Sequence, residues 1–254
     1  GFFRHVHTEH DVWHLEEPSA RKLEGWALRL FSPAHVALSP AMAARLKEIF
    51  PASQVTAIEN GIDTDRFKPA DKTVAQAALG LPPGHQVIGC AARLETVKGV
   101  DLLIEAFARL DAPDAILVLA GEGGEDGALR SLAARLGVGA RVHFLGALSD
   151  MVGFYPALDL YVQPSRNEGL PLAPLEALSS GAPVIATRVG QCGLLEPLGA
   201  LVVAAEDIPA LTHAMAAALA DPGDGAKRRA AVQTRYDLSV AAARYDALYA
   251  GRSA

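Results

Sequence analysis

Two acidic residues in one strand-to-helix segment are the strongest candidates for chemistry in this sequence. Glu168 follows an apolar run over 158–163, and Glu176 lies inside an apolar helical pattern over 172–180. On one continuous helix their side chains would point about 80° apart, because each residue turns the helix by about 100°. Pro171 and Pro174 instead mark a helix start, since proline is tolerated in a first helical turn. A loop before that helix lets both carboxylates line one cleft.

Glu176 has apolar neighbours on its predicted helix. A buried carboxylate in such surroundings needs a polar partner. A vicinal diol such as a ribose can donate two hydrogen bonds to one carboxylate. The alternative interpretation is a glutamate on the surface that binds nothing.

Two cations flank the junction after the predicted strand 86–91. Arg93 and Lys98 precede the helical pattern 100–110. Two positive side chains beside the free N–H groups of a helix N-terminus favour an anion, and a diphosphate suits them best. The alternative is an ordinary pair of surface cations.

Gly121 and Gly123 follow the predicted strand 115–120. Glycines permit a tight turn and the close approach of a ligand. Their Gly-x-Gly-Gly spacing is not the dinucleotide fingerprint, so a Rossmann-type dehydrogenase has little support. Loop flexibility is the alternative reason for these glycines.

Strand and helix patterns alternate through most of the chain, which predicts an α/β fold with a parallel sheet covered by helices on both faces. Ligands bind such sheets beyond the carboxyl ends of the strands. The first 50 residues differ, with helical patterns at 19–31 and 40–50 and no complete βα repeat, so we place a domain boundary at about residue 53. The expected strands are 55–59, 86–91, 115–120, 141–145, 158–163, 183–187 and 201–204; the expected helices in this part are 100–110, 128–136, 151–157, 172–180, 208–220, 226–235 and 238–249.

The composition excludes several functional classes. The net charge is −6 and no long basic run occurs, so nucleic acid is not an expected partner. Cys90 and Cys192 have no metal-ligand spacing and are expected to be reduced thiols. No apolar run reaches the ~18–20 residues of a membrane span. The chain begins at Gly1 within an apparent strand, which predicts a truncated N-terminus.

Three motifs together resemble the family 4 glycosyltransferases of GT-B fold. They are the Glu168-x7-Glu176 pair, the Arg93-x4-Lys98 pair and the segment Glu59-Asn60-Gly61-Ile62-Asp63. The segment from residue 5 to residue 11 also resembles members that build exopolysaccharide. The resemblance implies two Rossmann-like domains: 1–52 as the last part of an acceptor domain, 53–235 as the complete donor-binding domain, and 236–254 as a helix that packs back toward the first domain.

The resemblance implies roles for individual residues. Glu168 would contact hydroxyls of the donor sugar, Glu176 the ribose, and Arg93 with Lys98 the diphosphate. The resemblance also implies that backbone atoms around Phe144–Gly146 lie against the base of the nucleotide. The implied donor-binding set is Arg93, Lys98, Gly121, Gly123, Leu145, Gly146, Glu168, Gly169, Leu170, Leu172 and Glu176, and the implied catalytic set is His7, Arg93, Lys98 and Glu168, with His10 as the rival of His7.

The implied activity is a retaining, metal-independent transfer of a hexosyl group from a nucleoside diphosphate sugar, with no cofactor. Front-side attack is the expected route, because no nucleophile for a double displacement is apparent. The acceptor would be a carbohydrate, a lipid-linked glycan or another hydroxyl compound. We expect a cytoplasmic bacterial protein, with peripheral contact at the inner face of the membrane as an alternative. The rival functions are a GT-B nucleotide-sugar epimerase and a nucleotide-sugar-binding fragment without turnover.

Overall fold

A computed structural model describes residues 5–10, 15, 17–31 and 34–251 of the chain. The chain divides into two compact units. Residues Gly1–Gly61 and Tyr236–Ala254 form the first, and Ile62–Arg235 form the second. Each unit contains a parallel sheet with its own helices.

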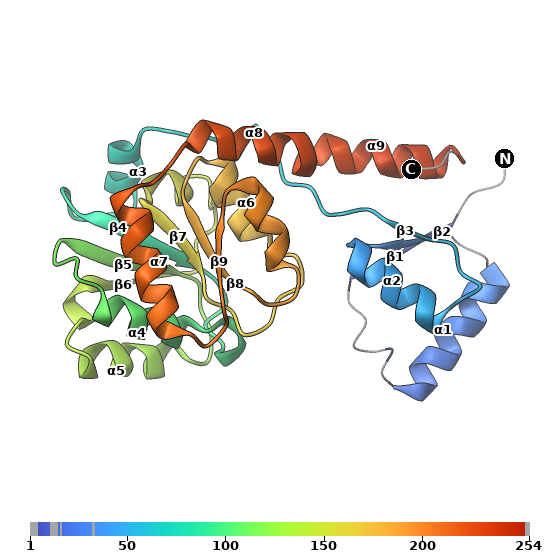
Figure 1. Cartoon of the computed structure of the whole chain (residues 1–254), viewed down its shortest axis with the longest axis horizontal. Coiled ribbons are helices and arrows are strands. Elements are labelled where there is room, and N and C mark those ends of the chain that lie inside the picture. Colours follow the sequence, from blue (N-terminus) through green and yellow to red (C-terminus); the bar gives the residue numbers. More distant parts are fainter. Residues whose placement is uncertain (1–4, 11–14, 16, 32–33, 252–254) are drawn as a thin grey trace. The chain divides into compact units, whose positions relative to one another are not determined.

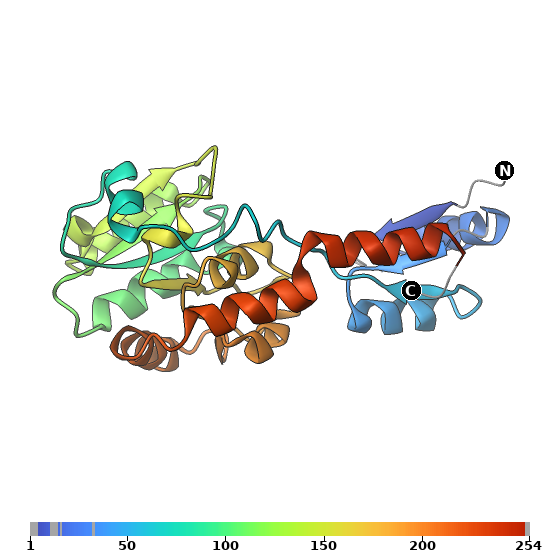
Figure 2. The same cartoon turned by 90° about the horizontal axis from the view of Figure 1, so that it is seen from above.

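The first unit has a three-stranded parallel sheet in the order β1-β2-β3 (Figure 1). Helix α2 begins at a strong start signal, in which Ser39 accepts a hydrogen bond from the Met42 N–H and Pro40 occupies the first turn. Figures 1 and 2 show α1 and α2 on one side of this sheet and α9 on the other. The bounds are β1 Val6–Glu9, α1 Pro18–Phe31, β2 Ala34–Ala37, α2 Pro40–Ile49, β3 Val55–Ala57 and α9 Leu238–Tyr249.

Two expectations for this region are wrong. The alternation β1-α1-β2-α2-β3 is a complete pair of βα repeats, which the sequence did not reveal because β1 and β2 are only four residues each. Strand β3 pairs with β2, with Val55 opposite His35, so it belongs to the first unit. The boundary therefore lies after Gly61, not at residue 53. Ala241 and Leu248 of α9 pack against Val36 and Ile58 of the first unit.

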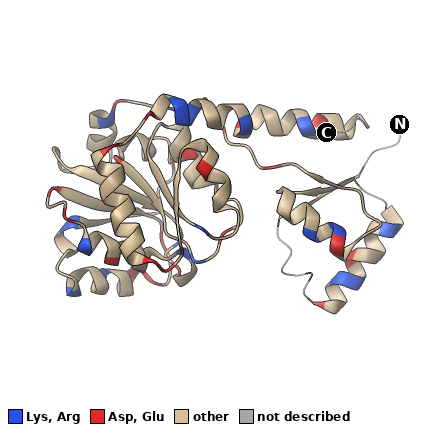
Figure 3. Ribbon diagram, in the orientation of Figure 1, with Lys and Arg blue, Asp and Glu red and all other residues tan. Residues whose placement is uncertain are grey.

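The second unit confirms the predicted parallel sheet, with strands in the order β6-β5-β4-β7-β8-β9. None of these six strands contains Lys, Arg, Asp or Glu, and the sheet is drawn in tan in Figure 3. Charged side chains in this unit therefore lie on the loops and helices that flank the sheet. The strand bounds are β4 Gln86–Ala91, β5 Ala115–Ala120, β6 Val142–Gly146, β7 Leu160–Gln163, β8 Val184–Thr187 and β9 Leu201–Val203.

Helices cover both faces of this sheet. Phe107 of α4, Leu129 of α5 and Met215 of α7 pack with Leu117 and Leu160 in one buried core, and each such side chain contributes roughly 1.5–3 kcal/mol when fully buried. The aromatic rings of Tyr155 and Tyr161 pack edge to face elsewhere in this unit. The helix bounds are α3 Lys72–Ala78, α4 Val100–Arg109, α5 Asp126–Arg135, α6 Leu172–Ser179, α7 Ile208–Ala220 and α8 Gly225–Tyr236.

Two local expectations fail in the second unit. Helix α3, capped by Asp71, was not anticipated. The predicted helix 151–157 is a turn followed by the short 3₁₀ segment Tyr155–Ala157. Its apolar residues reflect burial of Phe154 and Tyr155 rather than a helical face.

Candidate functional site

The strand order creates a switch point between β4 and β7. From β4 the chain continues to β5 on one side, whereas β7 lies on the other side, with Gly89 opposite Tyr161. Parallel α/β sheets bind ligands where the strand order reverses, beyond the carboxyl ends of the strands. The loop with Arg93 and Lys98 follows β4, and the loop with Glu168 follows β7. The two predicted loops therefore leave adjacent strands.

Glu168 is held by donors that converge on one of its oxygens. Its Oε1 accepts from Lys98 Nζ at 2.8 Å, from Gln163 Nε2 at 3.0 Å and from Ser165 Oγ at 2.7 Å. The Glu168 side chain is only 8% exposed and that of Lys98 is 20% exposed. Among the described residues no hydrogen bond to Oε2 is recorded, so this second oxygen can accept from a ligand.

Two residues that were not predicted from the sequence orient Glu168. Gln163 and Ser165 are buried, and Tyr161 O–H donates to Gln163 Oε1 at 2.7 Å. Gln163 Nε2 in turn donates to Ser165 Oγ at 2.8 Å. Buried polar groups with satisfied partners fix side-chain geometry. The sequence did contain a signal for this role, because Gln163 and Ser165 are polar residues at and just after the end of an otherwise apolar strand.

Lys98 ends a 3₁₀ segment, Thr96–Lys98, and Gly99 follows with φ 64°. A Cβ at Gly99 would lie 2.1 Å from the Pro164 carbonyl oxygen. Glycine is therefore required here, both for the left-handed conformation and for the close approach of the loop after β7. This contact brings the Lys98 loop beside the Glu168 loop.

Arg93 does not join that cluster. Its guanidinium pairs with Glu95, and its side chain is 69% exposed. An exposed pair of this kind is worth little to stability. Arg93 is thus close to the predicted site in sequence, but the structure assigns it no contact with Lys98 or Glu168.

Arg166 joins the two loops, which the sequence did not predict. It forms a two-pronged ion pair with Asp101, 2.7 Å on each prong, and also donates to the Thr96 carbonyl. Burial by itself would raise the pKa of Asp101, but the hydrogen bonds and charge of Arg166 lower it. Glu206 holds the remaining Nε of Arg166 at 2.6 Å.

Glu176 lies on α6 and accepts a hydrogen bond from Tyr155 O–H at 2.5 Å. Burial raises the pKa of Glu176, and the bond from Tyr155 and the charge of Arg66 only partly oppose this rise. Burial and the nearby Glu176 carboxylate raise the pKa of Tyr155, so the phenol stays a hydrogen-bond donor. Glu176 is half-buried and has one firm donor.

The backbone after Glu168 leads directly into α6. The N-cap is Pro171, and no side chain caps this helix. The first N–H groups of a helix have no partner within it, so the amides of Leu172 and its neighbours are available at this end. Gly190 packs so closely that a Cβ there would lie 1.7 Å from the Glu168 carbonyl oxygen. Gly169 accepts a bond from the Gln191 N–H at 3.3 Å, while Leu170 is partly buried.

Gly121 and Gly123, the glycines after β5 that were predicted to bind the donor, allow two loops to pack closely. A Cβ at Gly121 would lie 1.9 Å from the Ala92 carbonyl oxygen, and one at Gly123 would lie 2.3 Å from the Leu94 carbonyl oxygen. Both glycines therefore let the loop after β5 lie against the loop after β4. Gly121 N–H also donates to the Gly146 carbonyl at 2.8 Å, and Leu145 beside it is partly buried.

His7 and His10 belong to the first unit. His7 Nε2 lies 2.8 Å from Glu9 Oε1 and 3.1 Å from Glu24 Oε1. His10 is exposed. The sequence did not decide which of the two is the catalytic candidate. In the structure, His7 contacts two carboxylates, whereas His10 is exposed.

The sequence contains one Asp-x-Asp spacing, Asp63-Thr64-Asp65, a pattern that can bind a metal ion. Asp63 Oδ1 accepts from the backbone N–H groups of Asp65 and Arg66, so it closes a turn. Among the described residues, potential metal ligands gather instead in the first unit, at His7, Glu9 and His35.

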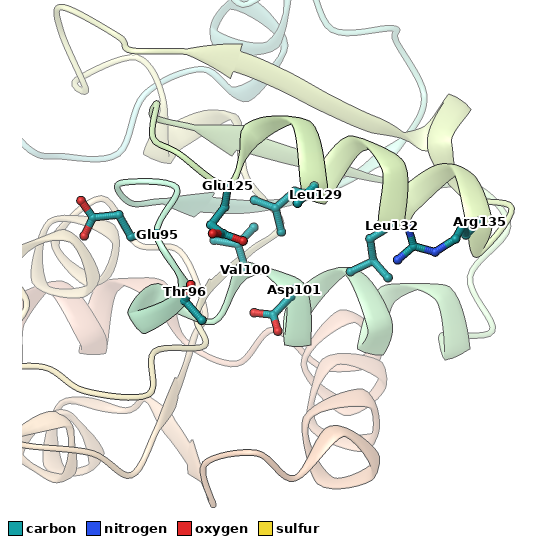
Figure 4. Close-up of a pocket in the computed structure, with 9 residues that line it drawn as sticks. Glu95, Thr96, Val100, Asp101, Glu125, Leu129, Leu132 and Arg135 are labelled. Carbon is teal, nitrogen blue, oxygen red and sulfur yellow. The ribbon is translucent and has the colours of Figure 1, made fainter.

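A cavity of about 170 Å³ lies between the loop before α4 and helix α5 (Figure 4). Asp101, which borders this cavity, is already held by Arg166. The cavity contains none of the predicted donor-binding residues. Its lining is Glu95, Thr96, Val100, Asp101, Glu125, Ala128, Leu129, Leu132 and Arg135.

Comparison with known families identifies this arrangement. Residues 71–236 match the model for glycosyl transferases group 1, and residues 2–66 match the model for glycosyltransferase family 4. The chain belongs to the group 1 glycosyltransferases. The resemblance drawn from the Arg-x4-Lys and Glu-x7-Glu motifs is thereby confirmed.

Curated relatives agree with the family assignment. A lipopolysaccharide core biosynthesis mannosyltransferase, LpsB, from Rhizobium meliloti is 39% identical over 65% of this chain and 51% of its own length. A D-inositol 3-phosphate glycosyltransferase from Mycobacterium sp. (strain KMS) is 35% identical over 71% of this chain and 43% of its own length. The chain thus spans about half the length of the curated relatives it matches.

Solved structures establish the fold. Anabaena HepE in complex with UDP matches 96% of this chain and 72% of its own, with a TM-score of 0.86 and 23% identity. Sucrose-phosphate synthase from Thermosynechococcus elongatus matches 97% of this chain and 67% of its own, with a TM-score of 0.82 and 26% identity. The predicted GT-B class, with parallel sheets flanked by helices, is confirmed. Within the described residues, no helix combines the length and apolarity needed to cross a bilayer.

Proposed function

We propose that the chain carries the donor-binding part of a retaining glycosyltransferase that uses a nucleoside diphosphate sugar. The observation that carries this proposal is the Lys98–Glu168 pair at the β4/β7 switch point. A cation and a carboxylate 2.8 Å apart suit a ligand in which a phosphate is bonded directly to a sugar. One group would face the phosphate and the other the sugar hydroxyls.

Lys98 and the amino-terminal end of α6 would hold the diphosphate. The Lys98 side chain is 20% exposed, so its ammonium group can turn toward a ligand while the side chain stays largely shielded from solvent. Free N–H groups at a helix N-terminus add partial positive charge. Together they would stabilise the charge that develops on the departing diphosphate. Arg93 would bind the phosphate only after its ion pair with Glu95 breaks.

Glu168 would position the sugar. Oε1 is occupied by its three donors, so Oε2 is the atom that would accept from sugar hydroxyls. The buried Gln163 and Ser165 keep this carboxylate in one orientation. A fixed acceptor loses little freedom when the sugar binds.

Glu176 would accept the two ribose hydroxyls. Tyr155 occupies Oε2 of this carboxylate, and Oε1 has no described protein partner. Ribose hydroxyls would supply the hydrogen bonds that a half-buried carboxylate requires. Retention of configuration by front-side attack, without a metal ion, completes the proposal. The solved HepE complexes contain UDP and UDP-glucose, which supports the donor class.

A panel of UDP, GDP and ADP, each with and without an attached hexose, tests the proposal through the melting temperature of the chain. We expect at least one diphosphate to raise it, because a ligand that binds only the folded state stabilises that state. The Glu105→Gln variant, altered on α4 outside the proposed site, should respond like the wild type. Absence of any shift across the panel would contradict the proposal. Release of an epimerised free nucleotide sugar, without an acceptor, would favour an epimerase.

A further inference from the structure

A second cluster of chemical groups lies in the first unit and includes none of the residues proposed to bind the donor. His7 and Glu9 are two residues apart on β1, so their side chains point to the same face of the sheet. His35 is the register partner of His7 on β2. Helix α1 contributes Glu24, whose Oε1 lies 3.1 Å from His7 Nε2.

His35 is the informative member of this cluster. Its side chain is fully buried, and Nδ1 lies 3.1 Å from Ser53 Oγ. Its other nitrogen, Nε2, is buried without a hydrogen-bond partner in the described structure. A buried polar atom without a partner destabilises the folded state, so such an atom usually has one.

Two carboxylates of the cluster approach the same ring nitrogen. His7 Nε2 faces both Glu9 and Glu24, whose side chains are 7% and 22% exposed. A single imidazole N–H cannot be directed well at both acceptors. A divalent cation in place of that proton would be bound by the ring nitrogen and by carboxylate oxygens together.

The separations suit a small divalent cation. Ligand atoms of His7, Glu9 and His35 all lie within 4.8 Å of one another. Ligands around tetrahedral Zn²⁺ stand about 3.3 Å apart, given bonds of about 2.0–2.2 Å. On binding of zinc, the 2.8 Å distance between His7 Nε2 and Glu9 Oε1 would increase slightly, and the His35 ring would move toward the ion.

We propose that His7, Glu9 and His35 form a Zn²⁺ site that ties β1 and β2 together, and that the Glu24 side chain turns inward from α1 to supply the fourth ligand. Two imidazole nitrogens favour zinc over magnesium or calcium, which prefer all-oxygen sites. The Ser53 hydroxyl supplies the outer hydrogen bond that commonly orients a ligating histidine. His7 is 41% exposed, which gives the ion an entry path.

Zinc titration of the EDTA-stripped chain against a chromophoric chelator tests this site. We expect one Zn²⁺ per chain and a higher melting temperature with the metal bound. His7→Gln and Glu9→Gln should each weaken binding by about 100-fold or more, since even outer partners of a ligand can change affinity by 10–100-fold. His213→Gln, which alters an exposed histidine on α7, should bind like the wild type.

Cobalt substitution gives a readout that does not depend on stability. Co²⁺ in the wild-type chain should show the strong visible absorption of tetrahedral coordination, and the His7→Gln chain should lose it. Circular dichroism establishes that each variant is folded, and Glu24→Gln, at a partly exposed position, replaces any variant that is not. The proposal is overturned when the wild type binds no Zn²⁺ or when His7→Gln and Glu9→Gln bind it as tightly as His213→Gln.

Discussion

Nζ of Lys98 lies 2.8 Å from Oε1 of Glu168, although 70 positions separate the two residues in the chain. The contact exists because β4 and β7 are neighbours in the sheet and because Gly99 allows their loops to touch. In the proposed function, Lys98 would contact the phosphate of the ligand and Glu168 would contact its sugar.

Glu168→Gln keeps the shape of the side chain and removes its charge. We expect the added affinity contributed by the sugar to fall by about 10- to 100-fold, because hydrogen bonds to a charged group are worth about 1.5–3 kcal/mol. The affinity for the nucleoside diphosphate alone should stay the same or rise, because Lys98 is freed from its ion pair. Calorimetric titration with each ligand measures both effects.

Lys98→Gln is the matching variant. It should weaken binding of the diphosphate and leave binding of the uncharged nucleoside unchanged. The double variant would complete a thermodynamic cycle that isolates the coupling between the two side chains. Equal losses for diphosphate and nucleoside in Lys98→Gln would contradict a phosphate role.

Glu176→Gln separates stability from binding. The folded pKa of Glu176 is raised above its ordinary value of 4.5, mainly by burial. A raised acid pKa contributes stability that is complete below pH 4.5 and is lost as the pH rises through the folded value. At pH 7 the ionised carboxylate therefore costs stability, and Gln removes that cost.

We expect Glu176→Gln to be at least as stable as the wild type in urea at pH 7, and to lose its advantage near pH 4. Its nucleotide affinity should fall by about tenfold, because a neutral amide accepts more weakly than a carboxylate. Tyr155→Phe should instead destabilise the chain, since the half-buried Glu176 loses its donor. Full nucleotide affinity in Glu176→Gln would exclude the ribose role.

Gly99→Ala tests the contact between the two loops. Alanine would have to adopt φ 64° with its Cβ 2.1 Å from the Pro164 carbonyl oxygen. We expect a loss of more than about 1 kcal/mol in the free energy of unfolding and weaker diphosphate binding, because the Lys98 loop is displaced. Gly124→Ala is the matched control, since nothing lies within 4 Å of its added Cβ. Similar effects in both variants would show that the close contact is unimportant.

The extent of prediction from sequence differs between the two halves of the chain. In the second unit, long apolar strands and flanking helices made the parallel sheet predictable, and Glu168 and Glu176 could be placed on a loop and a helix. In the first unit, β1 and β2 are too short to give a clear period. The apolar run that contains β3 could not reveal which sheet it joins, because that depends on pairing with β2.

The sequence by itself determined most elements of the second unit, the positions of Lys98 and Glu168 on loops after strands, the position of Glu176 on a helix, and the family resemblance. These follow from periodicity and from residue types along the chain. The tertiary structure alone decided that Lys98 meets Glu168 while Arg93 meets Glu95, that Gln163 and Tyr155 hold the two carboxylates, and that His35 faces His7. Each of these contacts depends on strand order, register or loop packing, and those are set by long-range contacts that no local pattern records.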